Sequence, residues 1–267
     1  MQKSKIWVKK GLYLVPNFFT TLTLFFGFLS LAYSQKGDIN VAVSCVCLAM
    51  VSDFMDGLIA RLTNTQSEFG QEYDSLADML AFGVAPASLA WHYAILKGLA
   101  QEPFWLITFV YLFAITARLA RFNALKQFSD TQFFRGLPSP AAAGLVCSVV
   151  LTCFKYDPSL PLELLLTGVL ILTSLCVVSN MAYPSLKRSD LLQRRPVLIF
   201  ALILLLAFVS MVDPLLALLG TLGTYALSGP LISTIHLYFN LPLKKMVFQR
   251  WGRVIVGIKK RRRVAKS

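Results

Sequence analysis

Long apolar blocks decide what this chain can fold into. Eight blocks, each near the roughly 20 residues that a membrane-crossing helix needs, alternate with short polar segments: 17–34, 39–61, 75–96, 103–121, 138–155, 161–183, 196–211 and 214–239. Backbone polar groups have no water partners inside a bilayer, so only helices and closed barrels cross it. Only 15% of the residues are charged, whereas soluble domains have about a quarter. We therefore predict an all-α integral membrane protein of about eight transmembrane helices.

The positive charges predict the orientation of these helices. If the N-terminus is cytoplasmic, the inner segments hold 23 of the 26 Lys and Arg residues and the outer segments hold only Lys36, Lys97 and Lys155. Cytoplasmic loops carry such an excess in membrane proteins. We expect both ends of the chain to lie inside, in a prokaryotic cytoplasmic membrane. The same placement explains the net charge of +13 without nucleic acid.

Three regions follow from this pattern. Residues 1–16 are basic and amphipathic and predict a short interfacial segment. Residues 17–240 form the transmembrane domain, and residues 241–267 form a basic cytoplasmic tail. The five cysteines lie in or beside apolar blocks and form no metal-ligand pattern with the two histidines, so we expect them to be small buried residues.

Acidic residues interrupt the second and third blocks at regular spacing. Asp53, Asp56, Gly57 and Ala60 follow an i, i+3, i+4, i+7 pattern and share one helix face. Asp74 and Asp78 share a face at the start of the next helix. The loop between the helices contains Gly70 and lets them return antiparallel. The two carboxylate pairs can then face each other.

This arrangement predicts a phosphoryl-transfer site. Clustered carboxylates suit hard divalent cations such as Mg²⁺ or Mn²⁺. The small residues Gly57 and Ala60 let a ligand approach the backbone, and Arg61 can donate paired hydrogen bonds to phosphate oxygens. The alternative is that the carboxylates line an ion pathway or pair between helices, as in a cation or lipid transporter.

The stretch from Asp53 to Asp78 resembles the signature of the CDP-alcohol phosphotransferase family, D-x-x-D-G-x-x-A-R-x(8)-G-x-x-x-D-x-x-x-D. Five further stretches are similar to the phosphatidylserine synthases of that family, the CDP-diacylglycerol–serine O-phosphatidyltransferases. They are FGVAPA (82–87), RLARFN (118–123), LPSPAAAG (137–144), SNMAYPSLK (179–187) and LSGP (227–230). Val15-Pro16-Asn17 matches an opening pattern of the family only in part.

The resemblance implies a mechanism and roles for these positions. Serine attacks the phosphorus attached to diacylglycerol, and CMP leaves. Two divalent cations are held by Asp53, Asp56, Asp74 and Asp78, and Asp78 also acts as the general base. The CDP-lipid site is shaped by Gly57, Ala60, Arg61, Gly70 and Asn17. The resemblance also implies a homodimer.

The acceptor needs a cation for its carboxylate if it is serine. Arg118 lies at the inner end of the fourth block, near the membrane level of Arg61, and is the first candidate, with Arg121 and Asn123 behind it. We expect Ser139 to be structural. The same chemistry with glycerol 3-phosphate, inositol or inositol phosphate, or choline stays open as an alternative.

Overall fold

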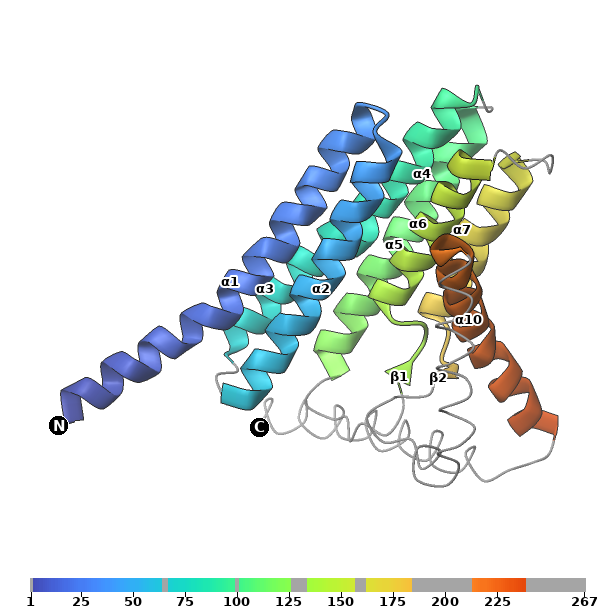
Figure 1. Ribbon diagram of the computed structural model, residues 1–267. Helices are drawn as coiled ribbons and strands as arrows, with labels where there is room; N and C mark the ends of the chain where they lie inside the picture. The colour runs from blue at the N-terminus through green and yellow to red at the C-terminus, as the bar shows by residue number, and fades with distance from the viewer. Residues whose placement is uncertain are drawn as a thin grey trace, which may run out of the picture.

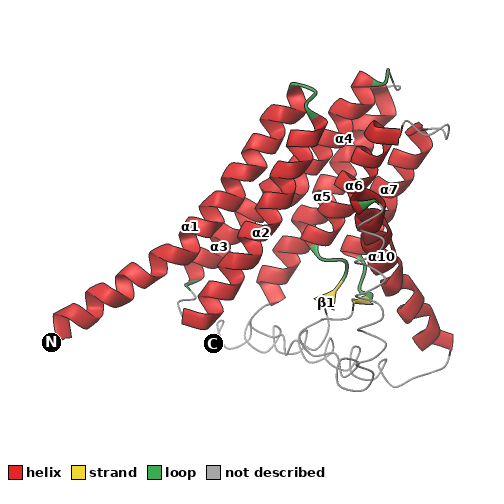
Figure 2. Ribbon diagram, viewed as in Figure 1, coloured by secondary structure: helices red, strands yellow, loops and turns green. Residues whose placement is uncertain are grey.

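Helices make up almost all of the protein that the structure describes. The computed structural model describes residues 2–63, 67–98, 101–125, 134–156, 162–183 and 213–238. Figures 1 and 2 show the helices side by side in one bundle. Their bounds are α1 Gln2–Gln35, α2 Ile39–Thr63, α3 Glu68–Asp78, the π-helical η1 Met79–Val84, α4 Ala85–Leu96, α5 Gln101–Leu125, α6 Ser139–Tyr156, α7 Leu162–Val178 and α10 Pro214–Tyr238.

Five helical segments are long and apolar enough to cross a membrane. They are Asn17–Gln35, Ile39–Thr63, Glu68–Leu96, Phe104–Ala124 and Ser139–Tyr156. These match the first five predicted spans, and they support an integral membrane protein. A shorter apolar helix covers Leu164–Val178, and α10 covers most of the predicted block 214–239. The predicted span 196–211 and the tail 241–267 lie outside the described residues.

Two helices begin earlier than the apolar blocks. The predicted interfacial segment 1–16 is continuous with the first span, because α1 is one helix from Gln2 to Gln35. The third segment begins at Glu68 rather than at residue 75. Ser67 caps it, since the Ser67 side chain accepts a hydrogen bond from the Gly70 N–H at 3.0 Å. The additional turns are polar, so hydropathy alone does not detect them.

The core lies between α2, η1, α4, α5, α6 and α7. Helix α6 is the central helix, because 61% of the segment Ser139–Tyr156 is buried, the highest share among the five spans. The largest fully buried side chains include Phe82, Tyr93 and Tyr111. Many phenylalanines on the outer helix faces are exposed, as a lipid-facing surface requires.

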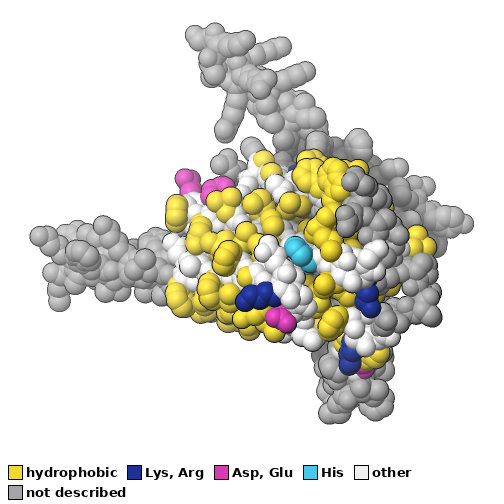
Figure 3. Space-filling model, turned by 90° about the horizontal axis from the view of Figure 1, so that it is seen from above, with side chains coloured by type: hydrophobic (Ala, Val, Ile, Leu, Met, Phe, Trp, Pro, Cys, Tyr) yellow, Lys and Arg dark blue, Asp and Glu magenta, His cyan; other side chains and the backbone are white. Residues whose placement is uncertain are grey.

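The two ends of the bundle carry different elements. In Figure 1 the α1–α2 turn and the ends of α4 and α6 lie together at one end. Figure 3 looks down on that end and shows mainly hydrophobic and uncharged polar side chains, with few charges. The aspartate-bearing part of α3 and the β-strands lie toward the other end.

A two-residue β-ladder joins the loop before α6 to the loop after α7. Strand β1 (Phe134–Arg135) pairs antiparallel with β2 (Ala182–Tyr183). Gly136 follows with φ +77°, a conformation that favours glycine. Its N–H donates to the Met181 carbonyl at 2.9 Å, and a Cβ there would lie 2.9 Å from the Ser179 carbonyl oxygen. Only glycine fits this turn without displacing the end of α7.

The π-helical turn η1 has a cause in the sequence. In an α-helix the Phe82 carbonyl would accept from the N–H of residue 86, but residue 86 is proline and has no N–H. The proline ring also crowds the carbonyl four residues earlier. The helix widens instead, and the Ala85 N–H donates to the Leu80 carbonyl five residues back. The widened turn begins directly after Asp78.

We predict that Gly136→Ala lowers the thermal stability of the protein in detergent. The left-handed conformation costs an L-residue about 1–2 kcal/mol, and the close carbonyl adds to this cost. Gly168→Ala is the matched control, because Gly168 lies on an exposed face of α7 and an added Cβ would have nothing within 4 Å. It should leave the melting temperature unchanged or raise it slightly. Equal melting temperatures for the two variants would contradict the prediction.

Candidate active site

Helix α2 presents the first set of candidate residues. It is unbroken from Ile39 to Thr63, so Asp53, Asp56, Gly57 and Ala60 share one face as predicted from their spacing. Asp56 is buried and Asp53 is half-buried. Gly57 is exposed, and a Cβ at this position would meet nothing within 4 Å. The backbone of α2 is therefore open to a ligand beside the carboxylates.

Helix α3 presents the second set. Asp74 and Asp78 lie one turn apart, and both are half-buried. At the start of α3, a Cβ on Gly70 would lie 3.0 Å from Ser67 Oγ and 3.2 Å from Asn17 Oδ1. Asn17 on α1 and Gly70 on α3 are thus neighbours, and both are positions that the family resemblance assigns to the CDP-lipid site.

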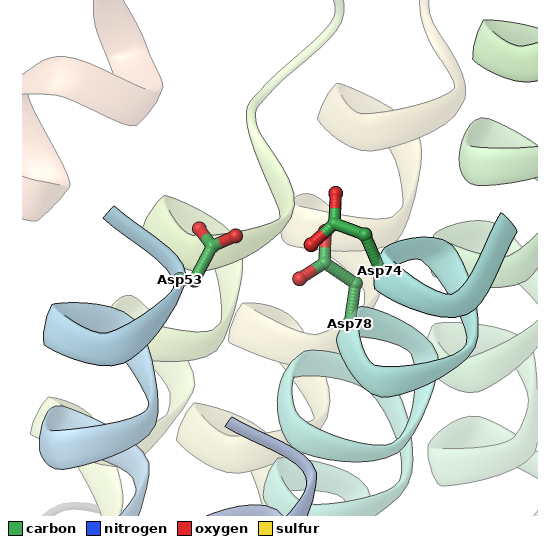
Figure 4. Close-up of side chains that lie close together, drawn as sticks. All are labelled: Asp53, Asp74 and Asp78. Carbon is green, nitrogen blue, oxygen red and sulfur yellow. The ribbon is translucent and has the colours of Figure 1, made fainter. Parts of the chain in front are cut away.

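Three carboxylates converge between α2 and α3. One oxygen from each of Asp53, Asp74 and Asp78 lies within 4.8 Å of the other two. Figure 4 shows Asp53 reaching from α2 toward Asp74 and Asp78 on α3. Like charges at this spacing repel one another in a medium of low dielectric constant, so the cluster needs compensating positive charge.

Asp56 lies outside this group of three. Its Oδ2 accepts a hydrogen bond from the hydroxyl of Thr20 on α1, and Thr20 is 1% exposed. Nearby, the Thr23 hydroxyl is 3.5 Å from the Ala49 carbonyl oxygen. Asp56, one of the predicted metal ligands, is therefore hydrogen-bonded to the first helix. The sequence-based prediction missed Thr20, although a hydroxyl on the buried face of an apolar helix is a signal for such a contact.

The carboxylate cluster fits a divalent cation. Its donors are hard oxygen atoms, the type that Mg²⁺ and Mn²⁺ prefer. Among the described residues, Asp78 Oδ1 is buried and accepts no hydrogen bond. A buried carboxylate oxygen without a partner is costly, and a bound cation would remove that cost. Asp53, Asp74 and Asp78 are the residues positioned to hold it.

Arg118 is the cation next to the cluster. It interacts electrostatically with Asp78, and its Nη1 donates to Ser139 Oγ at 2.8 Å. Ser139 is 1% exposed, at the start of α6. The Arg118 Nε is buried and has no hydrogen-bond partner among the described residues. Ser139, expected to be structural, thus orients an arginine whose Nε–H is available to a ligand.

Arg121 and Asn123 contact other protein groups. Arg121 Nη1 donates to the Val178 carbonyl at 2.9 Å and to Asn180 Oδ1 at 3.2 Å, at the end of α7. Asn123 Nδ2 donates to Ser75 Oγ at 2.9 Å and to Glu72 Oε2 at 3.2 Å, both on α3. The structure thus shows these two side chains joining helices.

Arg61, predicted to contact the phosphates of the CDP-lipid, is exposed at the last turns of α2.

Comparison with known proteins identifies the family of this chain. The model of the CDP-alcohol phosphatidyltransferase family matches residues 13–179. The chain belongs to this family. The match includes the carboxylate cluster, Arg118 and all the described helices from α2 to α7, so the cluster lies within the part of the chain that defines the family.

Individual relatives are similar over different lengths. A CDP-diacylglycerol–serine O-phosphatidyltransferase of Helicobacter pylori is 39% identical over 82% of this chain and 90% of its own length. An archaetidylserine synthase of Methanothermobacter thermautotrophicus is 33% identical over 64% of this chain and 69% of its own length. A CDP-diacylglycerol–serine O-phosphatidyltransferase of Saccharomyces cerevisiae is 39% identical over 49% of this chain and 51% of its own length.

We predict that Asp53→Asn weakens Mn²⁺ binding more than about tenfold, because loss even of a group that supports a metal ligand costs 10–100-fold. Binding is measured on the purified protein with Mn²⁺ alone, by the electron paramagnetic resonance signal of the free ion. Asp38→Asn, in the exposed turn before α2, is the matched control and should bind as the parent does. Unchanged binding by the Asp53 variant would remove this residue from the metal site.

Proposed function

We propose that this enzyme transfers the phosphatidyl group from CDP-diacylglycerol to the hydroxyl of L-serine, giving phosphatidylserine and CMP. The observation that carries the proposal is the 39% identity to the Helicobacter pylori serine enzyme over 82% of this chain. The half-buried Arg118 beside the carboxylate cluster supports it, because serine brings a carboxylate that needs a cation.

Two divalent cations, Mg²⁺ or Mn²⁺, are the proposed cofactors. Asp53, Asp74 and Asp78 form the cluster described above, and Asp56 lies one turn from Asp53 on the same helix face. When bound, such cations supply charge neutralisation for the pyrophosphate of the CDP-lipid.

Asp78 is the proposed general base. It lies beside Arg118, the proposed contact of the serine carboxylate, so the Asp78 oxygen that does not bind a cation can accept the proton of a serine hydroxyl. The serine oxygen then forms a bond to the phosphorus that carries diacylglycerol. The bond between that phosphorus and the bridging oxygen breaks, and CMP leaves with this oxygen.

The substrates are proposed to lie on opposite sides of the cluster. Gly57 and Ala60 offer a bare stretch of α2 to the CDP-lipid, with Arg61, Gly70 and Asn17 around it. Serine lies on the side of Arg118. Arg121 and Asn123 complete this pocket through their contacts with α7 and α3.

The membrane placement is also a proposal. Eight spans with both ends inside bring the active site to the cytoplasmic face of a prokaryotic cytoplasmic membrane. In this arrangement residues 1–16 lie at the interface, residues 17–240 form the catalytic domain, and residues 241–267 form a basic tail near anionic headgroups. We further propose a homodimer, as the family resemblance implies.

We predict metal-dependent CMP release from CDP-diacylglycerol with serine as the acceptor. Purified protein is given Mn²⁺ or Mg²⁺ and, separately, serine, glycerol 3-phosphate, inositol or choline, with an EDTA control. A CDP-lipid with archaeal ether tails tests the tail type. Release with another alcohol alone would overturn the serine assignment. A transporter would release no CMP with any acceptor.

Asp78→Asn should lower kcat by at least about 100-fold, because a positioned general base contributes 10²–10⁴-fold. The substitution removes one charge at nearly constant size, so elution and melting temperature in detergent should stay close to those of the parent. A folded Asp78 variant with near-parental kcat would exclude Asp78 as the base.

Arg118→Ala should chiefly raise the KM for serine, by roughly 10–100-fold, since hydrogen bonds to charged groups contribute about 1.5–3 kcal/mol. The KM for CDP-diacylglycerol should change much less. Arg61→Ala is the comparison variant and should show the reverse pattern. An unchanged serine KM in the Arg118 variant would move the carboxylate site elsewhere.

A further inference from the structure

The π-helical turn η1, which follows Asp78 directly, is held by a side chain of another helix. Tyr111 on α5 is 0% exposed, and its hydroxyl donates to the Phe82 carbonyl at 2.8 Å. In an α-helix this carbonyl would accept from the N–H of residue 86, but residue 86 is proline and has none. A side chain from another helix thus supplies a donor at the place where the backbone lacks one.

Close packing holds the same turn on two sides. A Cβ on Gly27 of α1 would lie 2.8 Å from the Ala81 Cα, so α1 touches the backbone of η1. On the other side, a Cβ on Gly83 would lie 3.0 Å from Leu112 Cδ1 on α5. The π-helical turn η1 therefore cannot rotate freely against either neighbour.

The widened turn changes which residues face the site. In an unbroken α-helix, Ala81, Ala85 and Leu89 would follow Asp78 along the same stripe, at i+3, i+7 and i+11. A π-helical turn adds about one residue, and so rotates the following helix by about 100°. The aspartates of α3 can then face α2 while α4 packs its apolar face in the core.

We propose that the Tyr111 hydroxyl is a positioning group for the active site: it holds the π-helical turn that aims Asp74 and Asp78 at Asp53. Tyr111 acts through the helix and contacts no substrate. The inference rests on the proposed function for its kinetic readout, whereas its metal-binding readout does not depend on the acceptor.

Tyr111→Phe tests this by removing one oxygen atom. We expect Mn²⁺ binding, measured with the ion alone, to weaken at least about fivefold and kcat to fall at least about tenfold, with the serine KM within about twofold of the parent. Tyr33→Phe, on α1 and outside η1, is the matched control and should match the parent in each measurement. Parental Mn²⁺ binding and kcat in the Tyr111 variant would overturn the proposal.

A second variant separates positioning from simple stabilisation. Pro86→Ala, added to Tyr111→Phe, restores an N–H that can donate to the Phe82 carbonyl and close the turn into an α-helix. Tyr111→Phe alone should lower the melting temperature, because it leaves the Phe82 carbonyl without its donor. In the double variant we expect the melting temperature to return toward that of the parent while Mn²⁺ binding and kcat stay low. If all three recover together, the hydroxyl only satisfied a carbonyl, and the proposal fails. Absence of CMP release by the parent would instead contradict the proposed function, and the Mn²⁺ measurements would still test Tyr111.

Discussion

Mutual repulsion among carboxylates in an apolar bundle is the constraint on which the rest of this structure depends. One oxygen from each of Asp53, Asp74 and Asp78 lies within 4.8 Å of the other two, inside a bundle of mostly apolar helices. Such groups are stable there only with compensating charge or hydrogen bonds. The protein supplies some of this itself, through Arg118 beside Asp78 and Thr20 beside Asp56. A bound cation, as proposed above, would supply the remainder and would couple the stability of the site to its chemistry.

Contacts between helices hold Arg118 in place beside the cluster. Arg121 joins α5 to the end of α7, and Asn123 joins α5 to α3. Both follow Arg118 within two turns of the same helix. Because α5 is fixed at both of these contacts, Arg118 is held in position beside Asp78, and its Nη1 is held by Ser139. The proposed acceptor pocket would benefit from this rigidity, since little ordering would be left to occur on binding.

Features that depend on local spacing could be predicted from the sequence, whereas contacts between distant residues could not. The i, i+3, i+4, i+7 pattern around Asp53 and the i, i+4 pair of Asp74 and Asp78 are properties of single helices, so sequence was sufficient to place them on common faces. Asp56, which lies outside the cluster, is hydrogen-bonded to Thr20, 36 residues away, and the partners of Arg121 lie at the end of α7. No periodicity encodes such pairs. The early start of α3 was missed because its first turns are polar, and the predicted eight spans exceed the five found in the described residues.

The π-helical turn shows how a local defect can serve a site. Pro86 makes an α-helix unfavourable at Phe82, and in isolation this would only weaken the segment. Here the defect lies directly after Asp78, where the chain changes from a polar helix facing the site to an apolar helix in the core. One continuous α-helix could not turn the aspartates toward the site and the apolar residues of α4 toward the core, because both sets would lie on the same stripe. Glycines on η1 and α1 allow the neighbours close enough to hold the widened turn. The proline that breaks the pattern therefore allows the charged and the apolar halves to take different rotations within one membrane span.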